Sequence, residues 1–375
     1  MSCPARLLMA AYDRFGYAFR RRHLPAPVKV ERICVISLNN IGDAVLTLPM
    51  VAAIASLFPE ARVTMLTKPA STELLATCPD IDEALGLDPY WKASARESAG
   101  LSKSGAVVRT SLDALDELLC KLDPQLVVAC EPDWMLNREL ARLRIPYAAG
   151  FVEAGGGFHL NIPTVSPTYG QQAQRIFALA TNVATALNFP KPAFKPAELQ
   201  PQAPSVTTAL KEAGVDPKKL IILHPVSTAR TKDWLPESWA EVIAALKKEG
   251  WQPASIGGKG TALPGTVDFC GRFSLVETAA LLIQARLFIG VDSGPGHIAT
   301  ASGCPVISLF SSVNDPARWA PTGKPGQVTV LYKEVADRAT YPLNAGQLPE
   351  GTKGNPYIDQ ITPAEVLAAA KRLLA

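Results

Sequence analysis

The feature that most constrains the fold is an alternation, starting at Val30, of short apolar segments with turns and amphipathic segments of helical period. Such a chain builds parallel sheets, because each helix returns the chain to the start of the next strand. The predicted strands are Ile33–Leu38, Val63–Thr67, Leu126–Ala129, Leu220–His224, Ala254–Ile256, Leu287–Val291 and Val306–Phe310, with helices over Ala44–Phe58 and Glu237–Glu249 among those between them. The sequence therefore predicts an α/β protein.

Prolines mark a break near the middle of the chain. Five of them lie between residues 190 and 204, more than a helix or a central strand accepts. A length of 375 residues with 48% hydrophobic residues is enough for two domains with full cores. We expect a basic N-terminal segment, a first domain, a linker, a second domain and a C-terminal helix at residues 1–28, 29–190, 191–204, 205–360 and 361–375.

Composition excludes several classes of protein. The 37 basic and 34 acidic residues give a net charge of +3, too small for a protein that coats nucleic acid. The seven cysteines form no C-x-x-C pair, which argues against structural zinc and favours a reducing compartment. No apolar run reaches the ~18–20 residues of a membrane span. We expect a cytoplasmic protein with no metal, no cofactor and no nucleic-acid partner.

The positive charge is concentrated at the N-terminus, where residues 1–32 carry seven basic and two acidic side chains. Apolar side chains in this segment follow one helical face, with basic ones mostly opposite. The apolar face holds Leu8, Tyr12, Phe15 and Phe19, and the basic side chains are Arg6, Arg14, Arg20 and Arg21. Two uses stay open: lying on an anionic membrane, as a peripheral protein on the inner face of the inner membrane, or packing on the first domain.

The first candidate site is the turn after the first strand, which contains Asn40, Gly42 and Asp43. Glycine allows a tight turn and a close approach of substrate, and Asp43 would stand at a helix N-terminus above the carboxyl edge of the sheet. There Asp43 either caps the helix or acts as a catalytic carboxylate.

The second candidate site is the loop after His224, with the hydroxyls of Ser227 and Thr228 and the ammonium of Lys232. Hydroxyl donors and one cation can bind phosphate, and a solvated loop is the alternative. His224 itself ends an apolar run, which is typical of a packed core histidine.

The third candidate site is a buried strand that runs into a glycine-rich turn and a helix. It consists of Asp292, Ser293, Gly294, Pro295, Gly296 and His297. The free N–H groups and the helix dipole favour a phosphate or diphosphate there, with a purely structural turn as the alternative. Neither G-x-x-x-x-G-K-[ST] nor G-x-G-x-x-G after a first strand is present, which disfavours a P-loop NTPase or a dinucleotide dehydrogenase.

Together these motifs resemble glycosyltransferase family 9, the heptosyltransferases of lipopolysaccharide core assembly. Five stretches match in order, at residues 42–49, 232–236, 270–275, 290–297 and 314–321. The resemblance implies a GT-B fold: two facing Rossmann-like domains, with the acceptor at the first, a nucleotide-diphospho-sugar in the second, and a C-terminal helix crossing back to the first domain.

The resemblance also implies residue roles. Asp43 would be the general base, and the substrate-binding residues would be Asn40, Gly42, Ser227, Thr228, Lys232 and the six residues from Asp292 to His297. The implied reaction is inverting transfer of heptose from ADP-heptose to a lipopolysaccharide core or related glycolipid. Ser293 stands where the family usually has threonine, and Ser311-Ser312 replaces a Gly-Pro pair. The alternatives are a sugar-nucleotide epimerase of similar fold and a non-catalytic sugar-nucleotide-binding protein.

Overall fold

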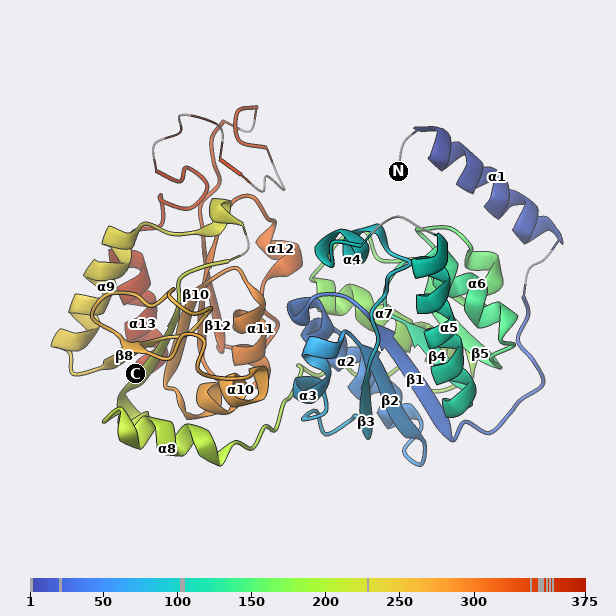
Figure 1. The fold of residues 1–375 in the computed structure, drawn as a ribbon, viewed down its shortest axis with the longest axis horizontal. Helices are drawn as coiled ribbons and strands as arrows, with labels where there is room; N and C mark the ends of the chain where they lie inside the picture. Colours follow the sequence, from blue (N-terminus) through green and yellow to red (C-terminus); the bar gives the residue numbers. More distant parts are fainter. Residues whose placement is uncertain are drawn as a thin grey trace. The chain divides into compact units, whose positions relative to one another are not determined.

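The structure is a computed structural model that describes residues 3–19, 22–101, 105–227, 229–337, 339–342, 347–348, 350, 352 and 354–375. It divides into two compact units, Met1–Lys195 and Pro196–Ala375, each with its own sheet and helices (Figure 1). The division falls within the proline-rich stretch 191–204. Among the described helices, none combines the length and the apolar composition needed to cross a bilayer.

The first unit is built on a parallel sheet with the strand order β3-β2-β1-β4-β5-β6. Its strands are β1 (Arg32–Ser37), β2 (Arg62–Thr67), β3 (Glu83–Gly86), β4 (Leu126–Ala129), β5 (Tyr147–Phe151) and β6 (Ile162–Thr164). Its helices are α1 (Cys3–Phe19), α2 (Ile41–Leu57), α3 (Thr72–Leu75), α4 (Ala93–Ser98), α5 (Gly105–Leu122), α6 (Trp134–Arg142) and α7 (Gln172–Ala186).

The second unit repeats this topology in a parallel sheet of order β12-β11-β10-β7-β8-β9. Its strands are β7 (Leu220–His224), β8 (Gln252–Ser255), β9 (Val267–Asp268), β10 (Leu287–Val291), β11 (Val306–Phe310) and β12 (Val328–Tyr332). Its helices are α8 (Pro204–Glu212), α9 (Pro236–Lys248), α10 (Leu275–Gln284), α11 (Gly294–Ala301), α12 (Pro316–Trp319) and α13 (Pro363–Leu374).

The strand order places one switch point in each sheet. Strands β2 and β3 lie on one side of β1, and strands β4, β5 and β6 lie on its other side. The strand order therefore reverses between β1 and β4. In the second sheet the reversal lies between β7 and β10. Open α/β sheets bind ligands beyond the carboxyl ends of the strands at such points. The predicted α/β class of two Rossmann-like domains is therefore confirmed, and each sheet has a defined place for a ligand.

The last helix, α13, packs within the second unit. It starts as expected, because the Thr362 side chain accepts the N–H of Glu365 and the Glu365 side chain accepts the N–H of Thr362. Its apolar face packs against α9 and strands β10 to β12, with Val366, Ala369 and Ala370 in the core of the second unit. The apolar stripe of α13 is covered within its own unit, and the crossing of this helix back to the first domain stays a prediction.

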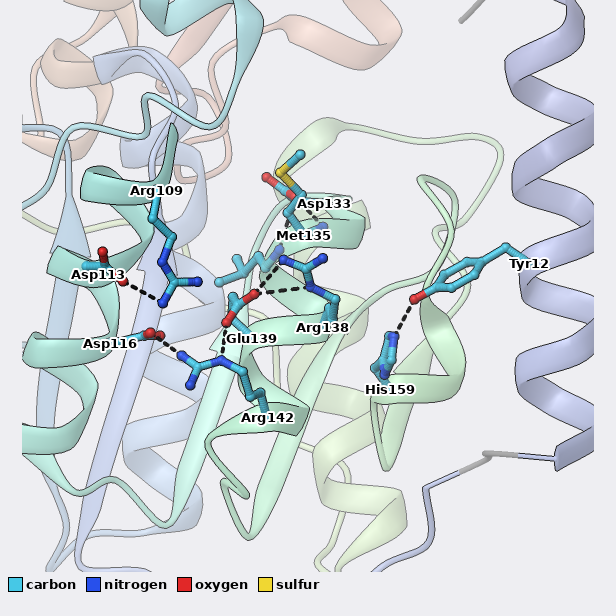
Figure 2. A network of polar contacts seen from close by, with 11 residues as sticks. Tyr12, Arg109, Asp113, Asp116, Asp133, Met135, Arg138, Glu139, Arg142 and His159 are labelled. Carbon is cyan, nitrogen blue, oxygen red and sulfur yellow. Dashed lines mark hydrogen bonds and ion pairs between the residues drawn. The ribbon is translucent and has the colours of Figure 1, made fainter. Parts of the chain in front are cut away.

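The N-terminal helix α1 docks on the first unit through Tyr12 (Figure 2). The Tyr12 hydroxyl lies 2.7 Å from His159 Nε2, and its ring meets Phe158 edge-on at 5.0 Å. On the same helix, Leu8 is 73% exposed and Phe15 56% exposed. The predicted apolar face is therefore divided between a docked and an outward part. Arg20 and Arg21 lie outside the described residues, as do the side chains of Arg6 and Phe19.

Candidate active site

The first group of predicted residues sits where β1 gives way to α2. Asn40, in extended backbone geometry, is the N-cap of α2, and its Oδ1 accepts a hydrogen bond from Lys68 Nζ at 3.1 Å. Asp43 is the third residue of the helix and is partly buried, with Gly42 before it. Asn40 rather than Asp43 therefore occupies the capping position. A carboxylate in the first turn is favoured by the helix dipole.

The second group brings together three loops of the second unit. Lys232, after β7, donates from Nζ to Asp292 Oδ2 at 2.7 Å and to the Asp292 carbonyl at 3.3 Å. Asn314, after β11, donates from Nδ2 to the same carboxylate oxygen at 2.7 Å. The Asp292 side chain is 6% exposed and that of Lys232 19%. These contacts hold the lysine at the carboxyl edge of the sheet, beside the β7/β10 switch point.

Backbone acceptors fix the loop that carries Lys232. Ser311 Oγ donates to the carbonyl of Thr231 at 2.6 Å, and Asn355 Nδ2 donates to the carbonyl of Asp233 at 2.8 Å. The Asp233 carboxylate in turn accepts the N–H of Ser227 at 3.2 Å. The Ser227 hydroxyl is bonded within its own loop, to the carbonyl of Ala229 at 2.9 Å.

Helix α11 begins beside this lysine with its first turn uncapped by a side chain. Ser293 is the N-cap, but its hydroxyl donates to the carbonyl of Val291 at 3.0 Å and lies 3.1 Å from His224 Nδ1. Gly294, Pro295 and Gly296 form the first turn and carry no polar side chain. A helix start of this kind presents backbone N–H groups and a positive dipole to an anion.

Both histidines of the site are buried and neutral at pH 7. Burial lowers the pKa of His224 to about 4. Burial also lowers the pKa of His297 to about 4, with Asp292 acting to raise it and Lys232 to lower it. Among the described residues, His297 Nδ1 has no hydrogen-bond partner. The positive charge at this edge therefore comes from Lys232 and the start of α11.

The structure places the predicted residues in two groups. Lys232 and the residues from Asp292 to His297 share one edge of the second sheet, with Ser227 on the loop before Lys232. Thr228 lies outside the described residues. Sequence reasoning missed Asn314 as a site residue, although it begins the last stretch on which the resemblance rests. It also missed Asn355, for which the sequence contains no signal.

Comparison with known proteins agrees with this architecture. The family model described as Glycosyltransferase family 9 (heptosyltransferase) matches residues 140–340. The lipopolysaccharide core heptosyltransferase OpsX of Haemophilus influenzae is 26% identical over 358 residues, covering 92% of this chain and 97% of that protein. A glycosyltransferase family 9 structure from Veillonella parvula shares the fold with a TM-score of 0.72 and 19% identity, covering 92% and 98% of the two chains. The E. coli ADP-heptose lipopolysaccharide heptosyltransferase II does so with a TM-score of 0.67 and 18% identity, at the same coverage. The chain belongs to glycosyltransferase family 9, the heptosyltransferases.

Proposed function

We propose that this glycosyltransferase moves heptose from ADP-heptose onto a lipopolysaccharide core or a related glycolipid, with inversion at the anomeric carbon. The observation that carries the proposal is the group of Lys232, Asp292 and Asn314 beside the uncapped start of α11, in a chain of family 9. The named activities of two similar proteins, on the lipopolysaccharide core and with ADP-heptose, support the choice of acceptor and donor.

In this proposal the second unit holds the donor. The diphosphate lies at the start of α11, where the backbone N–H groups of Gly294 and His297 and the helix dipole face it. Lys232 keeps one N–H donor beyond the two that it gives Asp292, because an ammonium group has three. We also assign donor binding to Ser227, on the loop before Lys232, and to Thr228, which lies outside the described residues. As the glycosidic bond breaks, negative charge collects on the departing ADP, and these groups stabilise it.

The first unit supplies the base. Asp43 takes the proton from an acceptor hydroxyl, and the oxygen attacks the anomeric carbon on the face opposite the leaving ADP, which inverts the configuration. Asn40 and Gly42 shape the turn that presents Asp43, and Lys68 holds the Asn40 side chain in place. The family match favours this transfer over a sugar-nucleotide epimerase or a non-catalytic binding protein.

The donor is tested with a panel of nucleotide sugars. We expect ADP-linked sugars to raise the melting temperature of the full chain more than UDP-, GDP- or CMP-linked sugars, since a ligand at 100 times its Kd stabilises a protein by ~2.7 kcal/mol. ADP-heptose should then give transfer to lipopolysaccharide core acceptors, followed by mass spectrometry. A larger shift with another nucleotide, and no product with ADP-heptose, would contradict the proposal.

We also propose that α1 brings the enzyme to an anionic membrane, where a glycolipid acceptor resides. With α1 docked through Tyr12, Leu8 and Phe15 each stay more than half exposed, in a segment with an excess of positive charge. Basic residues near an anionic surface contribute ~1 kcal/mol each, and apolar side chains add burial in the interface.

The double variant Leu8→Ser/Phe15→Ser tests this surface without touching the contact between Tyr12 and His159. We expect the wild type to sediment with anionic vesicles in a salt-sensitive manner and the double variant to bind them at least ~5-fold more weakly, with an unchanged melting temperature. Vesicles of neutral lipid are the control. A wild type that ignores anionic vesicles at low salt would remove the membrane from the proposal.

A further inference from the structure

A second pair of opposite charges lies at the switch point of the first sheet, beyond the carboxyl end of β4. Strand β4 is parallel to β1, and its pairing continues one residue further through the N–H of Cys130 and the carbonyl of Ile36. Glu131 follows immediately. Its carboxylate forms an ion pair with Lys92, which lies on the connection after β3. In the second unit an acidic residue, Asp292, likewise stands just past β10, the counterpart of β4, although its partner Lys232 follows β7 and not β9.

Polar contacts tie this pair to the segment that leads into α2 and Asp43. The backbone N–H of Leu38, the first residue after β1, faces the Glu131 carboxylate and lowers the pKa that burial raises. Five residues later, in the first turn of α2, the chain reaches Asp43. The connection before Lys92 is anchored too, because Trp91 Nε1 donates to Asp133 Oδ2 at 2.8 Å and Asp133 caps α6. Figure 2 shows Asp133 at the start of this helix.

The pair is poorly suited to a purely stabilising role. The Glu131 side chain is 9% exposed, and burial is the main cause that raises the pKa of its carboxyl. Its Oε1 atom is buried and has no hydrogen-bond partner among the described residues. Taking a carboxylate out of water is costly, and an ion pair that leaves one oxygen unsatisfied recovers only part of that cost. The Lys92 side chain is 22% exposed, so it is less buried than its partner.

We propose that Lys92 binds a hydroxyl of the acceptor sugar and that Glu131 is the residue that positions it. This inference rests on the proposed function. An ammonium group has three N–H donors, of which Glu131 takes one, so donors remain for sugar oxygens. Glu131 pairs with Lys92 and faces the backbone N–H of Leu38, so it relates the sugar contact to the segment that leads into α2 and Asp43. The first unit thereby binds the acceptor where its strand order predicts a ligand.

The experiment compares Lys92→Met, Lys92→Arg and Glu131→Gln in the full chain. A matched control is Glu139→Gln, which removes another buried, ion-paired carboxylate, this one on α6, where its partners are Arg138 and Arg142 (Figure 2). The probes are a deacylated lipopolysaccharide core saccharide, measured by calorimetry, and ADP. Transfer kinetics with the same saccharide separate KM from kcat, and melting temperatures report folding.

We expect Lys92→Met to weaken saccharide binding and raise the acceptor KM at least ~10-fold, with kcat within ~3-fold and ADP affinity within ~2-fold of wild type. Glu131→Gln should change the acceptor KM in the same direction, and Lys92→Arg should recover most of the binding. Glu139→Gln should lower only the melting temperature. If Lys92→Met does not fold, the contrast between Glu131→Gln and Glu139→Gln decides.

The inference would be overturned if Lys92→Met bound the saccharide with wild-type affinity. If Lys92→Met does not fold, wild-type affinity in a folded Glu131→Gln would overturn it. A wild-type protein that binds no saccharide would overturn it as well. A wild type that binds the saccharide but transfers no heptose would refute the proposed function instead. In that case, loss of saccharide binding in Lys92→Met would still support the role of Lys92.

Discussion

Replacing Asp43 by asparagine is expected to lower heptose transfer by ~100-fold or more while the protein stays folded and binds its donor. Asparagine keeps the size and polarity of the side chain but cannot accept the proton of the acceptor hydroxyl. Because Asn40 and not Asp43 occupies the N-cap position of α2, the substitution does not change the capping residue. The lost charge in the first turn costs only ~0.3–1 kcal/mol of stability.

The measurement compares the turnover, ADP affinity and melting temperature of Asp43→Asn with those of the wild type. Glu237→Gln is the matched control, because Glu237 is an exposed acidic residue in the first turn of α9, another helix that follows a strand of the sheet. The control should transfer heptose at the wild-type rate. If Asp43→Asn transfers heptose as fast as the control, Asp43 is not the base and serves only the local structure of α2.

Lys232→Ala is expected to weaken ADP binding by ~10-fold to ~100-fold and to slow transfer further. A hydrogen bond to a charged group is worth ~1.5–3 kcal/mol, and here the loss has a second part. Without Lys232, the Asp292 carboxylate keeps Asn314 as a partner but faces the diphosphate with its charge uncompensated. Repulsion between the two anions then adds to the missing attraction.

The double variant Lys232→Ala/Asp292→Asn separates these two parts. If repulsion contributes, the double variant binds ADP more tightly than Lys232→Ala alone, although more weakly than the wild type. Lys219→Ala, which removes an exposed lysine before β7 at the opposite edge of the sheet, should bind ADP normally. Unchanged ADP affinity in Lys232→Ala would mean that this lysine only stabilises its loop.

Central strands could be predicted from the sequence because helices cover both of their faces, which makes them continuous apolar runs. The predicted bounds of β10 and β11 agree with the structure, and every residue in both strands is buried. The outer strands lack this signal. Strand β6 contains Pro163, and strand β12 is only half-buried along its length, so neither was predicted.

The sequence predicted which residues lie at the candidate site, but not which of them form ion pairs with one another. Lys232 and Asp292 each follow a buried strand, which the sequence shows, but they are 60 residues apart and their ion pair depends on the sheet order. Lys92 lies in no recognisable motif and was missed for that reason. Helical periodicity predicted α1, but it placed Tyr12 on one apolar face with Leu8 and Phe15. Periodicity depends on apolar side chains alone, so it could not predict that the Tyr12 hydroxyl contacts His159.

The docking of α1 has a consequence for the order of events during translation. Tyr12 and its partner His159 are separated by 147 residues, so α1 is synthesised long before the segment on which it docks. At typical rates of ~5–20 residues per second, this interval lasts on the order of ten seconds. During that time both faces of the nascent helix are uncovered, and chaperones or a lipid surface can reach α1 before the first unit covers the side that carries Tyr12.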